Sequence, residues 1–131
     1  GVEDLSKYNI TANDVVVGIS VAGGAKYVLA AMEYAKANGA ITVGLTSNAE
    51  SQLAQISDIA ICTDTGAEVI TGSTRMKAGT AQKIILNMIS TTAMVKCGCV
   101  YENGCKGQEI YLHSQYRSGI CRAYGCNVCR K

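Results

Sequence analysis

The stretch Asp14-Val15-Val16-Val17-Gly18-Ile19-Ser20 decides the fold class of this chain. It is a short run of mostly β-branched residues between a charged residue and the Gly23-Gly24 loop, and it predicts a buried strand. Its apolar residues are continuous rather than alternating, which is typical of parallel strands whose two faces are both covered.

Similar runs recur along the chain with helical segments between them. Residues 41–46 and 58–63 predict two further strands. Apolar spacing predicts a helix that begins near Tyr27 and stops at Gly39, and a short helix over 52–57. Because strands and helices alternate at this spacing, we expect an α/β fold built on a right-handed parallel βαβαβ unit.

A longer apolar stripe follows the third strand. It predicts a helix that begins near Ser73 or Thr74, which are good N-cap residues, and ends near Gly98. After Gly98 the periodicity stops, and the sequence predicts no fold for the remaining residues.

Length and composition limit the possible functions. The chain has 131 residues, 48% of them apolar, and a net charge of +2, which suits one small domain or a piece of a larger one. We expect no nucleic-acid partner from so small a charge, and no membrane association, because no apolar run approaches the ~18–20 residues that span a bilayer. The polar first residues lack a secretory signal, so we expect a cytoplasmic protein.

Two segments carry residues suited to binding an anion. The first is the loop after the first strand, where Ser20 supplies a hydroxyl and Gly23 a flexible backbone amide at the carboxyl end of a strand. The alternative is a plain βα turn.

The second segment, Gly66 to Lys83, contains Ser73, Thr74, Arg75 and Lys77 at the expected helix start. Cations there oppose the helix dipole, so together with the hydroxyls and free helix amides they indicate an anion site. We expect Glu68 to pair with Arg75 or Lys77, or to bind sugar hydroxyls. The alternative is a capped helix with a solvated basic turn.

Six of the seven cysteines fall in the last 35 residues. A single Cys-x2-Cys pair, Cys126 and Cys129, is weak evidence for zinc, so a Cys-rich zinc-binding protein remains only an alternative. We interpret His113 as incidental. Cys62, on the third strand, is expected to be a small core residue.

The segment Gly66 to Lys83, with its Gly, Glu, Gly-Ser-Thr-Arg-x-Lys and later Lys, closely resembles the signature of the N-acetylmuramic acid 6-phosphate etherase and glucokinase regulatory protein family. These are sugar isomerase (SIS) domain proteins. The resemblance extends over residues 1–103 and implies a doubly wound three-layer sandwich around a parallel sheet, present here as an incomplete part.

The resemblance also implies a function. The family enzyme cleaves the lactyl ether of N-acetylmuramic acid 6-phosphate to N-acetylglucosamine 6-phosphate and D-lactate, in peptidoglycan sugar recycling. It needs no metal or other cofactor, and the full-length family forms homodimers. Phosphosugar-binding residues carried over or suggested by the motifs are Ser20, Gly23, Glu68, Ser73, Thr74, Arg75 and Lys77.

The family's catalytic glutamates lie upstream of what is Gly1 here, so no catalytic residue is assigned and the chain alone is expected to be inactive. The alternative is a non-catalytic phosphosugar-binding regulatory module. Residues 104–131 depart from the family pattern, and we treat them as an unassigned Cys-rich tail, out of frame or disordered.

Overall fold

A three-stranded parallel sheet is the centre of the first of two compact units, Gly1–Lys83. In the computed structural model, which describes residues 1–101 and 104–105, β1 (Val15–Ile19) pairs with β2 (Ile41–Thr46), and β2 pairs with β3 (Ile59–Cys62). The predicted α/β class and the parallel arrangement of the strands are confirmed.

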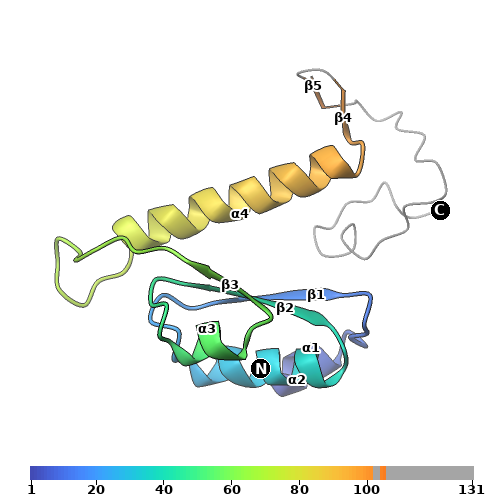
Figure 1. Ribbon diagram of the computed structural model, residues 1–131, viewed down its shortest axis with the longest axis horizontal. Coiled ribbons are helices and arrows are strands. Elements are labelled where there is room, and N and C mark those ends of the chain that lie inside the picture. The colour runs from blue at the N-terminus through green and yellow to red at the C-terminus, as the bar shows by residue number, and fades with distance from the viewer. Residues whose placement is uncertain (102–103, 106–131) are drawn as a thin grey trace. The chain divides into compact units, whose positions relative to one another are not determined.

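Three helices of this unit lie on one face of the sheet (Figure 1). They are α1 (Val2–Ser6), α2 (Lys26–Ala37) and α3 (Gln52–Ile56). Leu29, Met32 and Leu53 are the buried core between helices and sheet. Gly18 allows α2 to approach β1, because a Cβ at this position would lie 2.7 Å from Met32 Sδ.

The opposite face of the sheet is more open within the described residues. Val15, Ile41 and Ile59 point away from the helices by strand alternation, and each is about half exposed. The continuous apolar runs predicted cover on both faces, and the described structure shows helices over one. The prediction for Cys62 was wrong: it is exposed at the end of β3.

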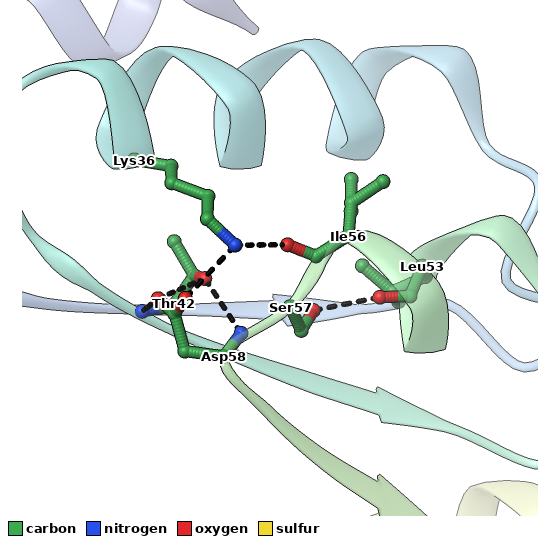
Figure 2. Close-up of polar contacts among 6 residues, drawn as sticks. All are labelled: Lys36, Thr42, Leu53, Ile56, Ser57 and Asp58. Atoms are coloured by element: carbon green, nitrogen blue, oxygen red, sulfur yellow. Dashed lines mark hydrogen bonds and ion pairs between the residues drawn. The ribbon is translucent and has the colours of Figure 1, made fainter.

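A polar network ties the amino ends of β2 and β3 to α2 (Figure 2). Lys36 Nζ forms an ion pair with Asp58 Oδ1 at 2.8 Å and donates to the Ile56 carbonyl at 3.0 Å. Asp58 Oδ2 accepts from the Thr42 hydroxyl at 2.7 Å and from the Thr42 amide at 2.9 Å. These contacts fix the turn that leads from α3 into β3, at the end of the sheet remote from its carboxyl edge.

Helix α4 (Lys77–Lys96) begins in the first unit and continues into the second, Ile84–Lys131. The predicted end near Gly98 is confirmed: Gly98 has a φ of 72°, and its amide donates to the Val95 carbonyl at 3.0 Å. The predicted start was wrong, because the first helical residue is Lys77 rather than one just after Ser73 or Thr74.

Beyond α4, a short antiparallel pair joins β4 (Val100–Tyr101) to β5 (Gly104–Cys105). The sequence had predicted no element there. The remainder of the Cys-rich tail, with His113, Cys126 and Cys129, lies outside the described residues. Among the helices that the structure does describe, none has the length and apolarity needed to cross a membrane.

Candidate functional site

A cavity of about 390 Å³ opens at the carboxyl edge of the sheet. Residues that follow each of the three strands line it: Val21 after β1, Ser47 after β2, and Asp64 with Thr65 after β3. In open parallel sheets this edge is the usual position of a ligand site, because the loops from neighbouring strands converge there. The cavity is therefore the candidate site of the first unit.

The loop between β3 and α4 forms the remaining wall. It contributes Glu68, Thr71, Ser73 and Thr74, joined by Ala78 at the start of α4. Of the residues proposed from the sequence, the structure thus brings Glu68, Ser73 and Thr74 together. Arg75 and Lys77 are exposed and do not line the cavity, and neither do Ser20 and Gly23.

Gly23 has a packing role in the β1 loop. Its φ is +68°, and a Cβ would collide with Ser51 Oγ, so this position requires glycine. Its amide donates to the Ser20 carbonyl at 3.1 Å and to Ser20 Oγ at 3.2 Å, and its carbonyl accepts from the Leu53 amide at 3.0 Å. The amide that was expected to bind an anion therefore has partners within its own loop.

The β1 loop is also fastened to the end of β2. The Val21 carbonyl accepts from the Ser47 amide at 2.9 Å and from the Thr46 hydroxyl at 3.0 Å. Thr46 is fully buried, and its hydroxyl also accepts from Ser51 Oγ at 3.4 Å. These bonds fix the cavity wall beside Val21 and Ser47.

Glu68 closes the amino end of α4. Its Oε2 accepts from the Lys77 amide and its Oε1 from the Ala78 amide, both at 3.1 Å. This side chain takes the capping role that Ser73 or Thr74 was expected to fill, which explains the later helix start. Lys77 Nζ donates instead to the Ala67 carbonyl at 2.7 Å, so both side chains bond to backbone groups in place of the expected contact between them.

The cavity residues missed from the sequence include three polar ones that follow predicted strands: Ser47, Asp64 and Thr65. The available signal was their position, because each directly follows a predicted strand or lies one residue further on. Asp64 also shapes the loop, since its Oδ1 accepts from the Gly66 amide at 3.0 Å.

The chemistry of the wall suits a hydroxyl-rich ligand. Most of its polar side chains carry hydroxyls, and the charged side chains that line it are the carboxylates of Asp64 and Glu68. Carboxylates and hydroxyls accept and donate hydrogen bonds to sugar hydroxyls. In the part of the chain that the structure describes, no group of three or more His, Cys, Asp or Glu side chains is arranged to hold a metal ion.

A parallel α/β sheet with a cavity at its carboxyl edge is typical of α/β domains that bind small ligands. Residues 3–92 match the SIS domain, and the chain belongs to this family.

Curated relatives extend the match along nearly the whole chain. An N-acetylmuramic acid 6-phosphate etherase of Erwinia tasmaniensis is 43% identical over 131 residues, covering 98% of this chain and 43% of that protein. An N-acetylmuramic acid 6-phosphate etherase of Escherichia coli O1:K1 is 46% identical, and the match covers 98% of this chain and 44% of that protein. The chain thus spans less than half the length of the curated relatives it matches, and the resemblance to the etherase family is confirmed.

These matches continue beyond residue 103, as an in-frame tail would produce. The division of the chain at residue 103 stays a prediction. Sequencing the coding DNA across this point tests whether the reading frame changes.

Solved structures agree in fold. A putative phosphosugar isomerase involved in capsule formation from Bacteroides fragilis is 28% identical, with a TM-score of 0.56 over 63% of this chain and 45% of that one. The structure of a hypothetical protein is 23% identical, with a TM-score of 0.54. The match covers 66% of this chain and 50% of that one, and at this identity it supports only the fold.

Proposed function

We propose that this chain binds N-acetylmuramic acid 6-phosphate and belongs to an enzyme that cleaves its lactyl ether, giving N-acetylglucosamine 6-phosphate and D-lactate. The observation that carries the proposal is the position of the signature segment. Glu68, Ser73 and Thr74 line the cavity at the carboxyl edge of the sheet. Identity of 43–46% to etherases supports this particular sugar among phosphosugars.

The groups around the cavity divide into two sets. Ser47, Ser73 and Thr74 line the cavity, and their hydroxyls suit the hydroxyl and acetamido groups of the sugar. The exposed cations Arg75 and Lys77, together with the Ser20 hydroxyl, are the candidates for the phosphate.

Catalysis by elimination needs one group to remove a proton and another to protonate the leaving ether oxygen. Both carboxylate oxygens of Glu68 already accept hydrogen bonds from backbone amides of α4, which makes Glu68 a poor candidate for either group. We therefore expect residues 1–131 to bind the sugar phosphate without turning it over. In the complete enzyme, assembly as a homodimer in the cytoplasm is part of the same proposal.

Calorimetry with N-acetylmuramic acid 6-phosphate tests the binding step. Ser73→Ala should weaken binding about 3- to 10-fold, as expected for one lost hydrogen bond. Ser6→Ala is the matched control, because Ser6 bonds only to the Glu3 carbonyl in α1 among the contacts described. Absence of binding to the wild-type chain would refute the proposed function.

A D-lactate assay separates the etherase from its alternative, a non-catalytic phosphosugar-binding module. The hydrogen bonds from the α4 amides to both Glu68 oxygens are the observation that favours the non-catalytic module. Turnover by the complete protein that contains this segment supports the etherase, whereas tight binding without D-lactate release supports the module.

A further inference from the structure

The amino end of α4 has no unpaired backbone donor among its first four residues. A helix normally leaves four such amides without an intrahelical partner, and these amides together with the helix dipole attract anions. In this structure the first three amides of α4 have acceptors outside the regular helical pattern: Lys77 and Ala78 donate to Glu68, and Gly79 donates to the Thr74 carbonyl at 2.9 Å. The Thr80 amide makes the first regular helical bond, to the Met76 carbonyl at 3.1 Å.

The acceptor for the first two amides is an anion. Each oxygen of the Glu68 carboxylate takes one amide, at 3.1 Å. Such charge-assisted bonds are stronger than bonds between neutral groups. Glu68 is half-buried in the cavity wall, and it occupies the position that a ligand phosphate would otherwise find attractive.

The same contacts shape the wall of the cavity. Glu68 lies nine residues before Lys77, so its bonds close the intervening loop back onto the helix. That loop carries Ser73 and Thr74, which line the cavity. The contact between Lys77 Nζ and the Ala67 carbonyl, at 2.7 Å, closes the loop a second time.

We propose that Glu68 is a positioning residue that acts as a built-in anion. It neutralises the amino end of α4, holds Ser73 and Thr74 in the cavity wall, and keeps a ligand's phosphate away from the α4 amides. The cavity then receives the uncharged, hydroxyl-bearing part of the ligand. This inference rests on the proposed phosphosugar function and assigns the orientation of the ligand in that site.

Titration of the ¹⁵N-labelled full chain with inorganic phosphate tests the inference. In the wild type, the Ala78 amide signal should not move, and the Lys77 signal should move only as far as phosphate at the Lys77 side chain shifts it. In Glu68→Ala both amides lose their acceptor, and both signals should move with phosphate in a saturable manner. A purely structural role for Glu68 would not create this new anion response.

Glu68→Gln provides a second variant that preserves size. Its carboxamide has one acceptor oxygen and no charge, so at least one of the two amide signals should respond to phosphate. Asp64→Asn is the control, because it removes a cavity carboxylate that bonds to Gly66 and not to α4. Its Lys77 and Ala78 signals should respond to phosphate as they do in the wild type. Circular dichroism establishes that each variant is folded, and Glu68→Gln decides the outcome if Glu68→Ala does not fold.

Two results would overturn the inference: a phosphate response of Lys77 and Ala78 in the wild type equal to that of Glu68→Ala, or no response in a folded variant. Addition of N-acetylmuramic acid 6-phosphate distinguishes this failure from that of the proposed function. If the sugar phosphate binds and its phosphate perturbs the α4 amides, only the orientation is wrong. If it does not bind at all, the proposed function fails.

Discussion

The Lys36 ammonium lies 2.8 Å from Asp58 Oδ1 and joins the last turn of α2 to the residue just before β3. The same carboxylate accepts two hydrogen bonds from Thr42, in β2. One aspartate thus connects a helix and two strands at the amino end of the sheet, opposite the candidate site. Its contacts set the position of β3 and, through β3, the starting point of the loop that lines the cavity.

Stability should fall in acid because of Asp58. The Lys36 ammonium, followed by the Thr42 hydroxyl and amide, holds the pKa of Asp58 well below its usual range. The unfolded chain takes up a proton near the ordinary aspartate value of about 3.9, while the folded chain does not. The stabilisation is therefore complete above about pH 5 and is lost as the pH falls below about 4 towards the folded-state pKa.

Urea unfolding of the wild type and Asp58→Asn from pH 7 down to pH 3 measures this effect. The wild type should have the larger free energy of unfolding at pH 7, and the difference in free energy between the two proteins should narrow towards pH 3. A difference in free energy of unfolding that does not change with pH would mean that the charge of the Asp58 carboxylate does not stabilise the fold.

Replacing Gly23 should destabilise the first unit. Gly23→Ala places a side chain at a φ of +68° and against Ser51 Oγ, which we expect to cost about 1–3 kcal/mol in the free energy of unfolding. Gly24→Ala is the matched control, because no atom lies within 4 Å of a Cβ there, and it should change stability little. Equal losses in both variants would contradict the packing role of Gly23.

Truncation of Met32 should leave a cavity beneath the sheet. Met32 is 1% exposed and packs in the core with Leu29 and Leu53, so Met32→Ala should cost about 2–5 kcal/mol in the free energy of unfolding. Met88→Ala, at a residue that is 62% exposed on α4, should cost much less. Chemical unfolding followed by circular dichroism compares them, and a small loss for Met32→Ala would place the core elsewhere.

Removal of either cation near the cavity should weaken sugar phosphate binding. We expect Arg75→Ala and Lys77→Ala each to reduce the binding free energy by about 1–3 kcal/mol, as for a lost charge-assisted hydrogen bond. Lys96→Ala, in the last turn of α4, is the control of like charge. Unchanged affinity in both variants, measured by calorimetry, would remove these cations from the phosphate site.

The candidate site was predicted from the sequence in part. The signature segment pointed to Glu68, Ser73 and Thr74, and the cavity contains them, because a loop after a parallel strand reaches the carboxyl edge of the sheet. Backbone amides take the place of Arg75 or Lys77 as the partners of Glu68, since a carboxylate can satisfy amides as well as side-chain cations. Short-range preference favoured Ser73 or Thr74 as the N-cap, and this longer-range contact replaced it.

The sequence by itself determined the order and type of the main elements, since short β-branched runs and helical spacing are local properties of the chain. It also determined the parallel α/β class, because strands connected through helices return in the same direction. The tertiary structure alone decided that Asp58 meets Lys36, that Ser51 excludes a side chain at Gly23, and that Glu68 begins α4. The first two contacts join residues far apart in the chain, and the third closes a loop onto a helix, so their geometry exists only when the sheet and helices have packed.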